Sequence, residues 1–175
     1  MKILVTGGAG YIGSHTTLCL LRNGFDVVVF DNFSNSSPVA LERVQKLCGK
    51  DLKIVEGDLC DRSVVQSVFK QNSDIEGVVH FAALKAVGES TDQPLSYYQN
   101  NVAGSIILLQ EMERVGIKNL VFSSSCTVYG EPEKVPLDEN HPTGLVSSPY
   151  GRTKYMVEGI IQDHCKANPL WNAAI

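Results

Sequence analysis

The chain has 175 residues, of which 43% are hydrophobic and 19% are charged, a size and composition that suit one globular domain with a sizeable core. Its formal net charge is −4 and it contains no run of basic residues, which argues against nucleic acid or an anionic membrane as a partner. No apolar run is long enough to span a bilayer, and the N-terminal MKILVTGG lacks the apolar stretch and cleavage site of a signal peptide.

Short β-branched runs alternate with helical patterns along the whole chain. In chain order we expect a strand at 2–6, a helix at 11–23, a strand at 26–30, a helix at 38–48, a strand at 52–56 and a helix at 61–71. A strand at 77–81, a long helix at 95–115, a strand at 118–123, a helix at 150–166 and a short strand at 171–175 follow. The strands are too apolar to leave one face in water. The pattern therefore predicts an α/β fold, a doubly wound parallel sheet of the Rossmann type with helices on both faces.

The cysteines and histidines predict neither a disulfide framework nor a metal site. The five cysteines are odd in number with no C-x-x-C pair, and the four histidines are scattered. Free thiols in a reducing cytosol are the simplest interpretation, so we expect a cytoplasmic protein. Cys19 lies in an apolar helical pattern and is expected to be a small core residue.

The stretch VTGGAGYIG follows the first expected strand and opens the first helix. In its G-x-x-G-x-x-G spacing, Gly7 permits a tight turn, Gly10 lets the backbone approach a pyrophosphate, and Gly13 lets helix and strand pack closely. The helix N-terminus supplies amide donors for phosphates. A glycine motif alone is unspecific, but its place between the strand and helix of a βαβ unit predicts a dinucleotide site.

Asp31 ends the second expected strand, eighteen residues beyond Gly13. A carboxylate at that place can accept hydrogen bonds from the ribose diol of an adenosine. It would repel a 2′-phosphate, and no arginine stands beside it in FDNFSNSS to offset that repulsion. The sequence therefore predicts NAD rather than NADP.

The ends of the other strands carry small or polar residues as well. Asp58 follows the third strand, where it could reach an adenine, and Lys85 follows the fourth, where it could bind a phosphate or ribose hydroxyl or simply lie in solvent. Phe81, Ala82 and Ala83 end the fourth strand, and small residues there leave room for a ligand. Open α/β sheets bind ligands at the carboxyl ends of their strands, so the five strand ends together predict one cofactor site.

Tyr150 and Lys154 lie four residues apart at the start of the last helix, so their side chains share one helix face. Alone, a Tyr-x-x-x-Lys pair also fits a tyrosine that caps the core and a lysine in solvent. A free phenol has a pKa of about 10, and an ammonium and a positively charged nicotinamide nearby would both stabilise a phenolate. With the Ser125 hydroxyl to orient a substrate alcohol, the three residues predict a hydride-transfer site beside a nicotinamide.

In TGGAGYIG, Ser125, Tyr150 and Lys154 the chain resembles the extended short-chain dehydrogenase/reductase family. HFAALKAVGES, YYQNNVAG and FSSSCTVYG narrow the resemblance to its UDP-sugar 4-epimerases, over essentially the whole chain. The resemblance implies that Ser125 and Tyr150 touch the sugar and that Lys154 contacts the nicotinamide ribose. It implies a tightly held NAD that contacts, besides the three glycines, Tyr11, Ile12, Asp31, Asn32, Ser34, Asn35, Ser36, Asp58, Leu59, Phe81, Ala82, Ala83, Lys85, Asn100, Tyr150 and Lys154.

The mechanism implied by the resemblance removes a proton and a hydride from C4 of the hexose, lets the 4-keto sugar rotate, and returns the hydride to its other face. UDP-glucose and UDP-galactose are the implied substrates, and a homodimer the implied assembly, of the intact enzyme. Members of the family continue into a second domain that grips the nucleotide part of the sugar, whereas this chain stops at NPLWNAAI. We therefore expect residues 1–175 to be an NAD-binding domain truncated near the sixth strand, which binds NAD without turnover.

Two other functions compete with this interpretation. A nucleotide-sugar 4,6-dehydratase needs an added acid/base pair next to the fifth strand, where Ser125, Cys126 and Thr127 offer no carboxylate. A non-catalytic NAD-binding module or redox sensor is the alternative from another class. The intact Tyr150/Lys154 pair argues against it as the ancestral role, and the missing second domain favours it as the behaviour of this chain.

Overall fold

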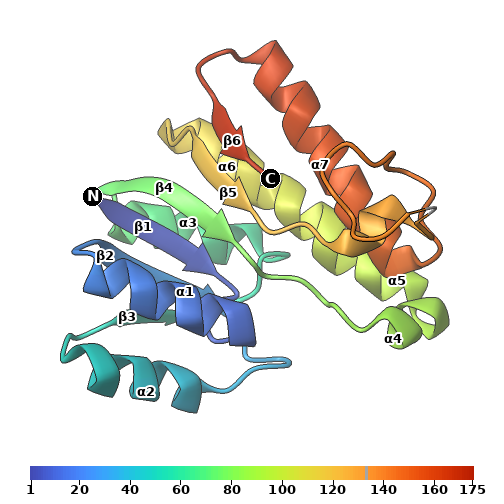
Figure 1. The fold of residues 1–175 in the computed structure, drawn as a ribbon. Coiled ribbons are helices and arrows are strands. Elements are labelled where there is room, and N and C mark those ends of the chain that lie inside the picture. Colours follow the sequence, from blue (N-terminus) through green and yellow to red (C-terminus); the bar gives the residue numbers. More distant parts are fainter. Residues whose placement is uncertain (133) are drawn as a thin grey trace.

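The structure, a computed structural model, describes residues 1–132 and 134–175. Six parallel strands form one sheet in the order β3-β2-β1-β4-β5-β6 (Figure 1). The strands are β1 (Lys2–Thr6), β2 (Asp26–Asp31), β3 (Lys53–Glu56), β4 (Ile75–His80), β5 (Asn119–Phe122) and β6 (Asn172–Ala174). This order confirms the predicted doubly wound sheet. From β1 the chain adds β2 and β3 on one side and then crosses over to add β4, β5 and β6 on the other side. The boundary between β1 and β4 is thus a topological switch point, where such sheets bind ligands.

Helices cover the two faces of the sheet (Figure 1). One face carries α1 (Tyr11–Arg22) and α2 (Pro38–Cys48), and the other carries α3 (Arg62–Gln71), α6 (Gly104–Val115) and α7 (Pro149–Ala167). Between β4 and α6 lie α4 (Val87–Asp92), α5 (Pro94–Tyr97) and the π-helix η1 (Tyr98–Ala103), and a 3₁₀ turn, η2 (Cys126–Tyr129), follows β5.

Alternate strand residues build two hydrophobic cores, one under each helical layer. Val5 and Val29 pack with Leu41 against α1 and α2, whereas their neighbours Leu4 and Val28 pack toward α3 and α6. All five side chains are at most 1% exposed. Because both faces of the central strands are buried, these strands have nearly continuous apolar sequences.

The structure departs from the sequence prediction mainly between β4 and α6. The expected helix at 95–115 is instead α5, a π-helical turn and α6, and α4 was not predicted. In the π-turn, the Asn101 side chain donates to the Leu84 carbonyl at 2.9 Å and to Thr153 Oγ1 at 3.0 Å, and it accepts from the Leu84 N–H at 2.8 Å. These tertiary bonds hold the extra residue of the π-turn, and such turns are frequent at functional sites.

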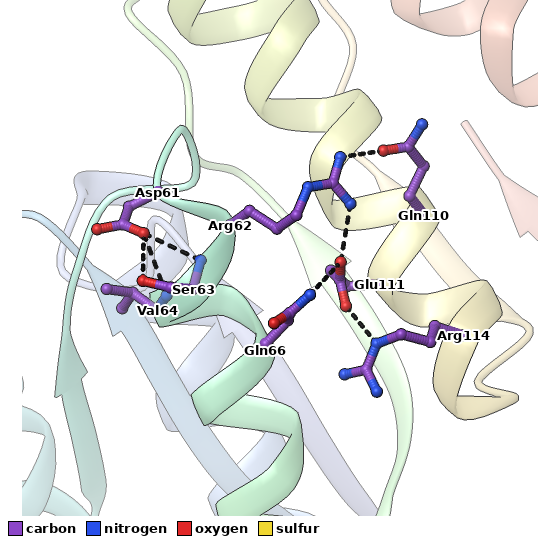
Figure 2. A network of polar contacts seen from close by, with 8 residues as sticks. All are labelled: Asp61, Arg62, Ser63, Val64, Gln66, Gln110, Glu111 and Arg114. Atoms are coloured by element: carbon purple, nitrogen blue, oxygen red, sulfur yellow. Dashed lines mark hydrogen bonds and ion pairs between the residues drawn. The ribbon is translucent and has the colours of Figure 1, made fainter.

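A network of polar contacts joins α3 to α6 (Figure 2). Glu111 is 2% exposed, and its carboxylate accepts from Arg62 at 2.8 Å, from Gln66 at 3.0 Å and from Arg114 at 2.5 Å. Arg62 also donates to Gln110. Burial alone would raise the pKa of Glu111, but the bonds from Arg114, Gln66 and Arg62 outweigh it and hold that pKa below its usual range. The two helices are thus tied by a carboxylate that stays charged.

The cysteine prediction was wrong in one detail. All five cysteines are free, but Cys19 is exposed, because the buried face of α1 is formed by Gly13, Thr17 and Leu21 at i, i+4 and i+8. Within residues 1–132 and 134–175, every helix is too short or too polar to cross a membrane. The same residues contain no group of three or more His, Cys, Asp or Glu side chains that could hold a metal ion.

Candidate functional site

A cleft opens at the carboxyl edge of the sheet, around the switch point between β1 and β4. The first turns of α1 and α7 and the π-helix η1 complete its walls. Of the residues predicted to contact a cofactor, the cleft is lined by Gly7, Gly10, Tyr11, Ile12, Gly13, Asp31, Asn32, Ser34, Asn35, Asp58, Leu59, Phe81, Ala82, Ala83, Lys85, Asn100, Tyr150 and Lys154. The fold therefore brings residues from across the first 154 positions to one edge.

The turn between β1 and α1 requires its glycines. Gly7 has φ +69°, a left-handed conformation that favours glycine, and a Cβ there would lie 2.6 Å from the Ala82 nitrogen. A Cβ on Gly13 would lie 2.2 Å from the Gly7 oxygen. The turn therefore packs tightly against the end of β4. The first residues of α1, whose amides have no partner inside the helix, line the cleft.

Asp31 is 7% exposed and already has three donors of its own chain. Its Oδ2 accepts from the Ala9 N–H at 2.9 Å, and its Oδ1 accepts from the Phe33 N–H at 2.9 Å and from Ser36 Oγ at 2.8 Å. The carboxylate thus ties the glycine turn to the loop after β2. Ser36 lies behind this carboxylate and is not among the residues that line the cleft.

The remaining wall near β2 and β3 is also held by polar side chains. Asn32 Nδ2 donates to Asp58 Oδ2 at 3.0 Å, and Asp58 Oδ1 accepts from the Cys60 N–H at 2.7 Å. Across the cleft, Asn100 donates to Asn101 in the π-turn at 2.9 Å. Each of these bonds orients a polar group of the lining before any ligand is bound.

Tyr150 and Lys154 are both buried, at 9% and 4% exposure, on the face of α7 that lines the cleft. Ser148 caps this helix by accepting from the Gly151 N–H, and Pro149 takes its first position. Lys154 Nζ donates to the Ser123 carbonyl at 2.7 Å. Burial lowers the pKa of Lys154 to about 8, and the charge of Glu158 acts in the opposite direction.

His80, at the end of β4, supports the cleft from behind. Its Nδ1 lies 2.6 Å from Thr6 Oγ1 and its Nε2 lies 2.9 Å from Ser105 Oγ. Ser105 gives its one proton to the Asn101 carbonyl at 2.5 Å, so it accepts from His80 and the ring carries its proton on Nε2. Burial, with a smaller effect of the Lys154 charge, lowers the pKa of His80 to about 3. A neutral imidazole therefore joins β1 and β4 to α6.

Ser125 is the predicted catalytic residue that the lining does not include. Its Oγ accepts from the Thr127 N–H at 3.3 Å and caps the 3₁₀ turn η2. Sequence reasoning also missed five residues that do line the cleft, namely Phe30, Gly57, Leu84, Ser123 and Ser124. Phe30, Gly57, Leu84 and Ser124 each adjoin a predicted residue in the sequence, and Ser123 lies two positions before Ser125, so the spacing of the strand ends was the signal that could have found them.

The comparisons with known proteins cover almost the whole chain. Residues 3–175 match the model of the NAD dependent epimerase/dehydratase family. The chain belongs to this family. It is 54% identical over 175 residues to UDP-glucose 4-epimerase of Haemophilus influenzae and 55% identical over 175 residues to that of Bacillus subtilis. These alignments take in 100% of this chain but 52% and 51% of the two relatives.

A solved member of the family has the same fold. The crystal structure of UDP-glucose 4-epimerase from Bifidobacterium longum, in complex with NAD+ and UDP, matches with a TM-score of 0.96 and 47% sequence identity. The match covers 99% of this chain and 51% of that one. The chain thus spans about half the length of the curated relatives it matches.

Proposed function

We propose that residues 1–175 form the NAD-binding part of a nucleotide-sugar 4-epimerase that interconverts UDP-glucose and UDP-galactose. The observation that carries the proposal is that one cleft joins the glycine turn, Asp31 and the buried Tyr150/Lys154 pair. The chain is also more than half identical to UDP-glucose 4-epimerases, and a solved relative holds NAD+ and UDP. The domain boundary, the homodimer and the cytoplasmic location stay predictions.

The residues of the cleft fit a nicotinamide dinucleotide. A Cβ at Gly7 or Gly13 would clash with neighbouring backbone, so the turn before α1 has no side chain at these two positions. The amides at the start of α1 would bind the pyrophosphate. Asp31 would accept from the adenosine ribose, and Asp58 would meet the adenine. When bound, NAD supplies the acceptor and later the donor of a hydride.

Two residues would act on the sugar, and Lys154 would act on the cofactor beside it. Tyr150 would take the proton of the C4 hydroxyl as the hydride leaves C4, and would return it after the 4-keto sugar has turned its other face. Lys154 would hold the nicotinamide ribose and stabilise the phenolate. Ser125 would orient the C4 oxygen, which requires its hydroxyl to turn from η2 toward the cleft.

The cleft favours an epimerase over a 4,6-dehydratase. Among the described residues that line it, the carboxylates are Asp31 and Asp58, and both lie at the β2–β3 side. Elimination needs an acid/base pair beside the sugar. The sugar would lie on the side of β5 and α7, where Ser125 and Tyr150 are. The residues there are Ser123, Ser124, Tyr150 and Lys154.

Replacement of Tyr150 by phenylalanine tests the proposed base. In the whole protein we expect Tyr150→Phe to keep NAD bound and to lower turnover of UDP-galactose by about 10²–10⁴-fold, because the acid/base step is lost. Tyr155→Phe is the matched control, since Tyr155 lies on the same helix but is 40% exposed. Turnover of Tyr150→Phe close to that of the control would mean that the proton goes elsewhere, for instance to Ser125.

A further inference from the structure

Two adjacent serines at the end of β5 contact two successive turns of α7. The carbonyl of Ser123 accepts from Lys154 Nζ at 2.7 Å, and the hydroxyl of Ser124 donates to Glu158 Oε1. Lys154 and Glu158 are at i and i+4, so they share one face of the helix with Tyr150 at i−4. The strand end and the helix are thus fastened by one cation and one anion, side by side.

The bond to Glu158 fixes what Ser124 can offer to the cleft. Ser124 lines the cleft, whereas Glu158 is half-buried behind it and is not part of the lining. A hydroxyl has a single proton, and Ser124 gives that proton to the carboxylate. The oxygen of Ser124 therefore faces an occupant of the cleft as an acceptor only.

Few charged groups surround the Lys154 ammonium. Glu158 acts on it from α7 itself. The Lys154 Nζ lies 4.7 Å from the centroid of the Phe122 ring. His80 of β4 packs against the same ring and is neutral. Tyr150 of α7 is the remaining titratable group of its helix face. The described ion pairs include no direct contact of Lys154 with Glu158, so the two charges act on each other through space.

We propose that Glu158 is a positioning residue of the cleft, which acts through Ser124 and Lys154 without touching cofactor or sugar. It turns the Ser124 hydroxyl into an acceptor, and its negative charge keeps the Lys154 side chain an ammonium despite burial. The inference deepens the proposed function and rests on it for the role of Lys154. The behaviour of Glu158 itself can be measured without cofactor or sugar.

Titration of Lys154 by NMR, in the cofactor-free chain with ¹³C-labelled lysine, tests the proposal. The Lys154 signal is assigned as the one that Lys154→Arg removes. Glu158→Gln keeps the size of the side chain and an oxygen for Ser124 but removes the charge, and we expect it to lower the Lys154 midpoint by roughly 0.5–1 pH unit. Glu158→Asp restores the charge, and its midpoint should lie between those of Glu158→Gln and the unchanged chain.

Asp163→Asn is the matched control, because Asp163 lies on the same helix with an 80% exposed side chain. It removes a charge of the same sign and should leave the midpoint unmoved. An unmoved midpoint in Glu158→Gln, or an equal shift in Asp163→Asn, would overturn the proposal. Glu158→Asp covers the case in which Glu158→Gln does not fold: its shorter side chain draws the charge back from Lys154, and a midpoint equal to that of the unchanged chain would contradict the proposal.

NAD titration of the same variants separates this inference from the proposed function. We expect Glu158→Gln to lose NAD affinity between pH 7 and pH 9 more steeply than the unchanged chain, because its Lys154 is neutral at a lower pH. Failure of the unchanged chain to bind NAD at pH 7 would contradict the proposed function and leave the Lys154 midpoints intact. Normal NAD binding with equal pH profiles for both chains would contradict the inference alone.

Discussion

Asp31 serves the fold and the candidate site with the same carboxylate. A carboxylate can accept about four hydrogen bonds, and Asp31 already accepts three from Ala9, Phe33 and Ser36. Phe33 has φ +55°, a left-handed backbone that is unusual for a bulky residue, and its N–H is one of these donors. One direction, on the oxygen that faces Ala9, is left for a ribose hydroxyl.

Substitution of Asp31 should therefore change the choice between NAD and NADP and, at the same time, remove the hydrogen bonds that hold the loop after β2. We expect Asp31→Ala to weaken NAD binding by roughly 10-fold or more, the loss typical of a hydrogen bond to a charged group, and to narrow the gap to NADP because the repulsion of a 2′-phosphate is gone. Calorimetric titration with both cofactors measures this.

Ser36→Ala is the control for the loop, since it removes one internal bond of Asp31 and keeps the charge. It should leave the preference for NAD unchanged. If the unchanged chain binds NADP better than NAD, the role given to Asp31 is wrong.

The residues of the site could be predicted where backbone geometry decides them. Gly7, Gly13 and Asp31 hold their positions because a turn, a close approach and a strand end leave little choice of residue. Of the three serines after β5 the sequence analysis selected Ser125, but all three are small and polar, so the sequence does not show which of them line the cleft. Tertiary bonds decide that Ser124 lines the cleft while Ser125 caps η2.

At the scale of elements, the sequence predicted the strands and every long helix except the one expected at 95–115 well, because their burial has a simple period. It failed for α4, where Gly88, Ser90 and Thr91 are poor helix formers. Tyr97 is fully buried there and donates to Glu89 at 2.6 Å, and burial followed by this bond raises its pKa to about 12. Such contacts have no local signature.

The α3–α6 pair gives a stability prediction of its own. Glu111→Gln removes the charge that Arg62 and Arg114 share, and both arginines are about half exposed, so water can partly replace the lost bonds. We expect the free energy of unfolding to fall by about 1–3 kcal/mol, as for hydrogen bonds to charged groups, with NAD affinity unchanged because the network lies outside the cleft.

Urea denaturation with and without NAD measures both quantities. Glu42→Gln on the exposed side of α2 is the control and should stay within about 0.5 kcal/mol of the unchanged chain. A Glu111→Gln chain as stable as this control would show that the charge of Glu111 adds no net stability.

At the scale of the whole molecule, the sheet order decides what the chain can bind. The reversal between β1 and β4 opens the cleft at one edge, and every predicted cofactor contact but Ser36 lines it. The outermost strand on the β5 side of the sheet, β6, is not covered by the other residues that the structure describes. The three residues of β6 are all exposed, and Val121 of β5 is 48% exposed on a groove that β6 shares. In a polypeptide of residues 1–175, an exposed edge strand with apolar neighbours favours self-association.

We expect a polypeptide of residues 1–175 to bind NAD, more weakly than the longer relatives, and to give no measurable epimerisation of UDP-galactose. The relatives devote about as much chain again to the rest of the enzyme, and binding energy from remote parts of a substrate is what positions its reacting carbon. Without such contacts the sugar C4 would rarely lie against the nicotinamide. The test is to incubate the purified chain with NAD and UDP-galactose and to resolve the two sugars by chromatography, with Tyr150→Phe purified in parallel to reveal contaminating host enzyme. Sustained formation of UDP-glucose by the unchanged chain, and not by the variant, would show that these residues hold the sugar unaided and that the positioning argument is wrong.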